Sequence, residues 1–196
     1  MFPKIKTPLK TDEMIFPEST FIMNFDGCSK GNPGLSGAGA VIYCLDDEIW
    51  SSSLFVGNNS TNNQSEYTGL IFGLQKAIDM KIKTLLVKGD SLLVINQMTG
   101  IYKCNSENIL ELYKKAKELE KMFDNIFYCH VLRKYNKRAD ELSNAAIKNV
   151  AIKKDFLPPI NMSRDYDDDD NKNIPARNID TVGIVFPCDN HSITIE

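Results

Sequence analysis

FIMNFDGCSKGNPGLSGAGAVIY, residues 21–43, places a carboxylate after an apolar strand pattern and follows it with a glycine-rich segment. The apolar run predicts a buried strand over residues 20–26 that ends on Asp26. Residues 27–34 contain three glycines and a proline, which predicts a turn. A second apolar run then predicts a strand over residues 38–44. An acid at the end of a buried strand, beside glycines, is the feature that needs an explanation.

The pattern continues as a meander and then changes to a helical period. EIWSSSLFVG, residues 48–57, predicts a third strand, joined to the second through the hairpin signal Asp46-Asp47. From Asn63 the apolar residues recur with helical spacing, so a helix is expected, capped by Thr61 or Asn62. Glu66 is expected in the first turn of this helix.

The second half predicts alternating strands and helices. TLLVKGD, residues 84–90, is a short apolar strand ending on Asp90, and a helix from Leu92 stops at Gly100. An amphipathic helix at 105–123, a strand at 125–132, a basic turn at 133–138 and a helix at 139–154 follow. The series predicts an α/β fold with a five-stranded mixed sheet, three antiparallel strands and then two parallel ones, flanked by helices.

Composition divides the chain into three parts: an N-terminal extension (1–19), a folded domain (20–157) and an acidic C-terminal tail (158–196). Residues 21–157 carry 17 basic and 15 acidic residues, whereas 158–196 carry 3 and 8, so the net charge of −3 does not describe the folded part. The apolar segments 181–189 and 191–196 of the tail fit either short docking strands or an unstructured segment.

The chain has the composition of an intracellular globular protein. Its residues are 42% hydrophobic and 25% charged, and no apolar run approaches the length of a membrane span. The five cysteines are odd in number and form no CxxC pair, which favours free thiols in a reducing compartment over a zinc site. We expect a monomer in the cytoplasm or nucleus that is neither secreted nor bound to a membrane.

Four carboxylates occupy corresponding places in the predicted elements. Asp26 and Asp90 close strands, and Glu66 and Asp140 lie at the starts of helices. In a sheet whose first and fourth strands are neighbours, these ends meet at one edge. Four acids in contact need compensating cations, and all-oxygen ligands suit Mg²⁺ or Mn²⁺. Two such ions about 4 Å apart can activate a water and stabilise a leaving oxygen in phosphodiester cleavage.

Taken singly, each acid has a simpler interpretation. An aspartate at a strand end is most often a turn or cap residue, and a glutamate early in a helix is favoured by the helix dipole. The hypothesis therefore depends on the series of four.

Four blocks of the sequence resemble type 1 ribonuclease H: DGCSKGNPG (26–34), TNNQSEYTGLIFGL (61–74), VKGDSLLVINQ (87–97) and HVLRKYNKRADELSNAAI (130–147). They occur in the order of that family and cover residues 20–152. The last block is similar to the branch that includes archaeal, bacterial and plant members. The resemblance implies an endonuclease that cuts the RNA strand of RNA–DNA hybrids and leaves 3′-hydroxyl and 5′-phosphate ends.

The resemblance also implies roles for single residues. Asp26 would hold both ions, Asp140 would help to hold the ion that activates water, and Glu66 and Asp90 would hold the ion on the leaving-group side. The positions that match substrate-binding residues of the family are Gly27, Cys28, Asn32, Thr61, Asn62 and Asn63.

The chain departs from better-known members in two places. The loop before Asp140 is short and lacks their histidine, so Arg133 is the expected substitute, and His130 is expected to be structural. The basic protrusion between the middle helices is missing, which leaves Lys103 and residues 133–138 for phosphate contacts.

Two rival hypotheses remain. A 3′–5′ exonuclease also uses four acids, but its D-x-E opening is missing here, since Gly27 and Cys28 follow Asp26. A non-catalytic nucleic-acid-binding module would keep the fold without the chemistry, although such relatives usually lose at least one acid.

Overall fold

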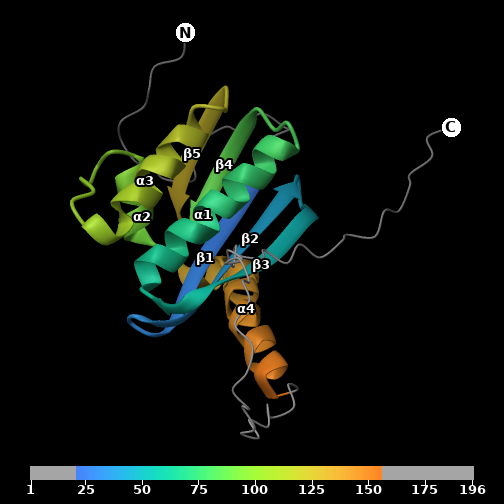
Figure 1. Cartoon of the computed structure of the whole chain (residues 1–196). Coiled ribbons are helices and arrows are strands. Elements are labelled where there is room, and N and C mark those ends of the chain that lie inside the picture. Colours follow the sequence, from blue (N-terminus) through green and yellow to red (C-terminus); the bar gives the residue numbers. More distant parts are fainter. Residues whose placement is uncertain (1–20, 156–196) are drawn as a thin grey trace, which may run out of the picture. The chain divides into compact units, whose positions relative to one another are not determined.

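The computed structural model describes the backbone of residues 21–155 and the side chains up to residue 150. The predicted extension (1–19) and acidic tail (158–196), including its two alternative structures, lie outside the described residues. The elements are β1 (Phe21–Gly31), β2 (Gly34–Cys44), β3 (Asp47–Ser60), α1 (Asn62–Asp79), β4 (Thr84–Gly89), α2 (Leu92–Met98), α3 (Glu107–Glu120), β5 (Asn125–His130), the 3-10 turn η2 (Arg133–Tyr135) and α4 (Lys137–Asp155) (Figure 1).

One mixed sheet of five strands organises the domain, in the order β3-β2-β1-β4-β5. The pairs β1–β2 and β2–β3 are antiparallel, and β1–β4 and β4–β5 are parallel, which confirms the predicted fold class. The last parallel pair between β1 and β4 is Phe25 with Gly89. Asp26 follows Phe25 and Asp90 follows Gly89, so the register of these two strands places the two acids side by side.

The strand end predicted at Asp26 is wrong, and the turn predicted over residues 27–34 is much shorter than expected. β1 continues to Gly31, and its antiparallel pairing with β2 runs unbroken from Asp26↔Gly39 to Gly31↔Gly34, which leaves a turn of only Asn32 and Pro33. Asp26 therefore lies inside β1, at the point where the strand loses its neighbour β4. The glycines were taken for turn residues because sequence alone does not distinguish a turn from a strand that other backbone approaches closely.

The helices cover the two faces of the sheet. Helix α1 packs on β1 and β2, with α3 beside it, and α4 packs on β2 from the other side (Figure 1). Strand side chains alternate between faces, and accordingly Met23 and Ala40 contact α1 at Gly73, while Gly37 and Gly39 face α4. The buried core lies under α1, where its largest fully buried side chains are those of Tyr67, Phe25, Met23, Ile42, Leu70, Leu74 and Leu85.

Within the described residues, none of the helices combines the length and the apolar character needed to cross a membrane. Helices α2 and α3 are joined by residues 99–106 alone, so this part of the chain has no room for a further helix between them.

Close backbone contact fixes α4 on the sheet. A Cβ atom added at Gly39 would lie 2.6 Å from the backbone oxygen of Ala139, closer than side-chain carbons are found. Because glycine has no Cβ, the first turn of α4 can lie directly on β2. This contact sets the position of the neighbouring Asp140.

Candidate active site

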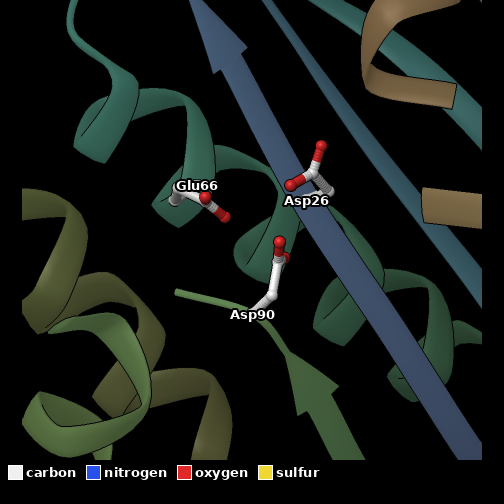
Figure 2. A group of neighbouring side chains, drawn as sticks. All are labelled: Asp26, Glu66 and Asp90. Atoms are coloured by element: carbon white, nitrogen blue, oxygen red, sulfur yellow. The ribbon is translucent and has the colours of Figure 1, made fainter. Parts of the chain in front are cut away.

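Three carboxylates meet where β1 passes the end of β4. Asp26, Glu66 and Asp90 each offer one oxygen, and these oxygens lie within 4.8 Å of one another. Figure 2 shows them reaching toward one space from strand β1, helix α1 and the residue after β4, respectively. The structure therefore brings together three of the four predicted acids.

Glu66 is held by the start of α1. Thr61 is the N-cap of this helix, and its hydroxyl accepts a hydrogen bond from the backbone N–H of Gln64, whose side chain in turn accepts from the Thr61 N–H. The prediction that Glu66 lies in the first turn is wrong, because the first turn contains no acid and Glu66 follows it. One turn deeper, the side chain is buried at 5% exposure.

The carboxylate of Glu66 is not fully satisfied by the protein. Its Oε2 is buried and has no hydrogen-bond partner among the described residues. Burial, reinforced by the charges of Asp26 and Asp90, raises the pKa of Glu66 well above its usual value, and a hydrogen bond from the Gly27 backbone only partly opposes this shift. A buried acceptor without a donor, beside two further acids, is suited to a cation.

Gly27 is required by the path of α1. A Cβ atom at this position would lie 2.1 Å from the backbone nitrogen of Glu66. The glycine therefore allows the helix to approach β1 closely enough for Glu66 to reach Asp26.

Asp26 is buried and accepts a hydrogen bond from helix α4. It is 4% exposed, and Oδ2 accepts a hydrogen bond from the Ser143 hydroxyl at 2.5 Å. Burial raises the pKa of Asp26 to about 7; the Ser143 hydrogen bond opposes that shift, and the charges of Asp90 and Asp140 add to it.

Asp90 is oriented by a residue that the sequence analysis did not single out. The buried Asn136 donates from Nδ2 to Oδ1 of Asp90 at 2.7 Å and to the backbone oxygen of Phe25 at 2.8 Å. Its Oδ1 accepts from the Asn24 side chain at 3.1 Å, and its backbone oxygen accepts from the N–H of Asp140 at 3.1 Å. This one residue thus connects β1 and the end of β4 through its side-chain amide, and the start of α4 through its backbone oxygen.

The fourth acid lies at the side of the cluster. Asp140 is in the first turn of α4, as predicted, and its carboxylate pairs with the Arg133 guanidinium. It is outside the group of three, although it is near enough for its charge to raise the pKa of Asp26. Arg133 is 73% exposed, and the carboxylate beside it raises the pKa of its guanidinium.

The three clustered acids, Asp26, Glu66 and Asp90, line a polar pocket of about 290 Å³. Of the predicted substrate-binding residues, Gly27, Cys28, Asn62 and Arg133 line it. Asn32 lies next to it, where its Oδ1 accepts from the backbone N–H of Asn62 at 3.1 Å.

The remaining predicted positions are at the start of α1 or outside the acid cluster. Thr61 caps α1, and Asn63 is exposed in its first turn. His130 is exposed, and its Nε2 lies 3.2 Å from the backbone oxygen of Asp90, so the structural role expected for it remains a prediction.

Three pocket residues were missed in the sequence: Ser29, Lys30 and Asn144. Lys30 follows the acid along β1, and Asn144 lies one helical turn after Asp140. The i, i+4 spacing from Asp140 was the signal for Asn144, because residues four apart share a helix face.

This strand order, together with acids clustered where β1 passes the end of β4, defines a ribonuclease H-like protein. The sequence model described as "Reverse transcriptase-like" matches residues 24–146. The chain belongs to this family, in its type 1 ribonuclease H branch.

Individual relatives agree. The chain is 38% identical over 131 residues to the bifunctional protein Rv2228c of Mycobacterium tuberculosis, covering 66% of this chain and 36% of that protein. It is 38% identical over 126 residues to ribonuclease HI of Halobacterium salinarum, covering 64% and 63%. The chain therefore spans about a third of the first relative and less than two thirds of the second.

Solved structures match the same region. The N-terminal RNase H domain of Rv2228c has a TM-score of 0.66 at 37% identity and covers 69% of this chain and 99% of that one. LC11-RNase H1, solved in complex with an RNA/DNA hybrid, has a TM-score of 0.63 at 32% identity and covers 67% and 99%.

Proposed function

We propose that this chain is a metal-dependent endoribonuclease that hydrolyses the RNA strand of RNA–DNA hybrids and leaves 3′-hydroxyl and 5′-phosphate ends. The observation that carries the proposal is the convergence of Asp26, Glu66 and Asp90 within 4.8 Å, around a buried Glu66 oxygen that lacks a partner among the described residues. Relatives that are ribonucleases H, one of them solved with an RNA/DNA hybrid, support the same activity.

The residues present fit divalent cations. Hard oxygen donors are the ligands that Mg²⁺ and Mn²⁺ prefer, and the three clustered acids offer only such donors. Asp26, Glu66, Asp90 and Asp140 would hold two Mg²⁺ ions, with Mn²⁺ as an alternative. When bound, such ions activate a water and stabilise the leaving oxygen of an in-line phosphodiester displacement.

The chain's own residues prepare the site for this chemistry. Asn136 orients Asp90, and the close packing permitted by Gly27 brings Glu66 against Asp26. Arg133 pairs with Asp140 and also lines the pocket, and its guanidinium is proposed to contact the phosphate that approaches the acids. Lys30, which lines the pocket as well, adds a second positive charge there.

Recognition of RNA is assigned to the rim formed by the β1–β2 turn and the start of α1. Because the Asn32 side-chain oxygen is already used by the Asn62 backbone, its Nδ2 remains available as a donor. Asn62, Asn63 and the backbone around Gly27 and Cys28 are the further groups proposed to contact sugar hydroxyls and bases. The 2′-hydroxyl is the group that distinguishes RNA from DNA.

Thr61 is proposed to contact a phosphate of the DNA strand. In the cap of α1 its hydroxyl accepts from the Gln64 N–H and donates to the Gln64 Oε1 at 3.1 Å, so a phosphate oxygen would take the place of that side-chain oxygen as the acceptor. All the proposed ligands and contacts come from one chain, and we propose that it acts as a monomer.

The experiment incubates the purified chain with a hybrid labelled uniformly in its RNA strand, with an RNA duplex and with a DNA duplex, each with Mg²⁺ or with a chelator. Internal cuts in the hybrid RNA that need Mg²⁺ and are lost in Asp26→Asn support the proposal. Enzymes specific for a 5′-phosphate or a 3′-hydroxyl identify the ends.

Other outcomes overturn the proposal. Stepwise shortening from the 3′ end would indicate an exonuclease. Binding of the hybrid without cleavage at any metal concentration would indicate a non-catalytic module. Cleavage by Asp26→Asn at the wild-type rate would show that the site is assigned wrongly.

A further inference from the structure

Ser143 is a buried hydroxyl next to the acid cluster that the proposed function has not used. It lies on α4, three residues after Asp140 and therefore on the same helix face. Its side chain is completely buried. The Oγ atom lies 2.5 Å from Oδ2 of Asp26 and 2.9 Å from the backbone oxygen of Asp140.

The hydrogen of Ser143 goes to Asp26 when that acid is ionised. A hydroxyl has one hydrogen to donate, and an ionised carboxylate accepts a stronger hydrogen bond than a backbone carbonyl does. The distance to Asp26 is also the shorter of the two. The contact to the Asp140 carbonyl matches the common local bond of helix serines, whereas the bond to Asp26 crosses 117 residues of sequence.

Ser143 has little freedom to move away from Asp26. A Cβ atom at Gly37 of β2 would lie 2.3 Å from the backbone oxygen of Ser143, so helix and strand are in direct backbone contact here. Because β2 is paired with β1 at Gly39↔Asp26, the strand that carries Asp26 and the helix that carries Ser143 are held together through β2.

We propose that Ser143 is a positioning residue that fixes the orientation of the Asp26 carboxylate for metal binding. The inference rests on the proposed metal-binding role of Asp26. Rotation of an aspartate carboxylate about its last bond is broad and roughly two-fold, so packing alone does not select one orientation. The bond to Ser143 holds Oδ2, and Figure 2 shows one Asp26 oxygen directed toward Glu66 and Asp90 while the other points away from them.

The same bond links two acids that come from different elements. Asp140 begins α4, and Ser143 one turn later holds Asp26 of β1. Displacement of α4 would therefore move Asp140 and release Asp26 together. Groups that hydrogen-bond to a metal-ligating side chain typically change metal affinity or activity by about 10- to 100-fold when they are removed.

The test compares Ser143→Ala with a matched control, Ser36→Ala, in the full-length chain. Ser36 is also completely buried, but its hydroxyl bonds to Ser29 and to the backbone oxygens of Gly34 and Ser60. Calorimetric titration with Mn²⁺ and with Mg²⁺ in the absence of nucleic acid measures metal affinity directly. Circular dichroism and urea unfolding report whether each variant folds.

We expect Ser143→Ala to fold and to bind the ions about 10- to 100-fold more weakly than the wild type. Cleavage of the hybrid should then need a higher Mg²⁺ concentration, and kcat should fall. The KM for the hybrid should stay unchanged, because the proposed substrate contacts are made by other residues. Ser36→Ala should change stability but leave metal affinity and the Mg²⁺ dependence of cleavage unchanged.

A second variant keeps the test decisive if alanine does not fold. Ser143→Cys preserves the size of the side chain but is a weak donor, so its metal affinity should also fall below that of the wild type. A folded Ser143 variant with wild-type metal affinity and wild-type Mg²⁺ dependence would overturn the inference. An equal loss in Ser36→Ala would do the same, because it would reduce the effect to general destabilisation.

Failure of the inference and failure of the proposed function give different results. If the wild type binds the ions and cuts the hybrid but Ser143→Ala matches it, only the positioning role is wrong. If the wild type binds no divalent ion, the proposed function is wrong and the inference falls with it.

Discussion

Neutralising Asp26 should stabilise the protein while it abolishes the proposed activity. Asp26 is 4% exposed, and burial raises the pKa of its carboxyl from 3.8 to about 7. The folded state therefore holds a proton on Asp26 at pH values where the unfolded chain has lost it. Asp26→Asn has nearly the same shape, offers an amide oxygen to Ser143 and removes this cost of ionisation.

The sign and size follow from proton linkage. Between pH 3.8 and about 7 the folded state binds more protons than the unfolded state, so the free energy of unfolding of the wild type falls as pH rises and levels off above about 7. At about 1.4 kcal/mol per pKa unit, the full effect has a ceiling of about 4 kcal/mol. The advantage of Asp26→Asn should widen by about 2–3 kcal/mol between pH 5 and pH 8.

Urea unfolding of the full-length chain, in chelator and reductant, measures this difference. Trp50, the single tryptophan, packs edge-on against Phe72 at 5.3 Å between ring centroids, so its fluorescence reports the contact between β3 and α1. Asp46→Asn is the matched control, because Asp46 is exposed in the β2–β3 turn and should stay within about 0.5 kcal/mol of the wild type at every pH.

Added Mg²⁺ should reduce the stability advantage of Asp26→Asn over the wild type. An ion that binds only the folded state stabilises it by mass action, and Asp26→Asn should gain less than the wild type. The reasoning is refuted if Asp26→Asn is less stable than the wild type at pH 8 in chelator, or if the difference between them stays constant from pH 5 to pH 8.

Three further outcomes are expected. Asn136→Ala removes a buried amide that serves three partners, so it should lower the free energy of unfolding by about 2–4 kcal/mol in urea titrations; a loss below about 0.5 kcal/mol would contradict its assigned contacts. Arg133→Ala should change stability by less than about 1 kcal/mol, because the side chain is 73% exposed, yet it should slow cleavage and reduce the salt dependence of hybrid binding by about one charge in filter-binding assays. Because burial raises the pKa values of Asp26 and Glu66, Mg²⁺ binding should release protons and tighten from pH 6 to pH 8, as calorimetry in buffers of different ionisation enthalpy would show; an affinity independent of pH would contradict this.

The local sequence pattern was sufficient to predict the order of strands and helices and to recognise the family. The apolar run before Asp26, the helical spacing after Asn63 and the apolar run before Asp90 predict the order of strands and helices that the structure shows. These signals are local, because each depends on which face of a strand or helix is buried. The spacing of the four acids along the chain was likewise readable, and it was enough to suggest the chemistry.

Tertiary structure decided which groups meet. The sequence did not show that β1 continues past Asp26, that Asp140 pairs with Arg133, or that Asn136 holds Asp90. The Ser143–Asp26 bond joins residues 117 apart, and no local period encodes such a contact. These contacts depend on the parallel register of β1 and β4 and on the close packing of α4 against β2, which are fixed only when the whole sheet has formed.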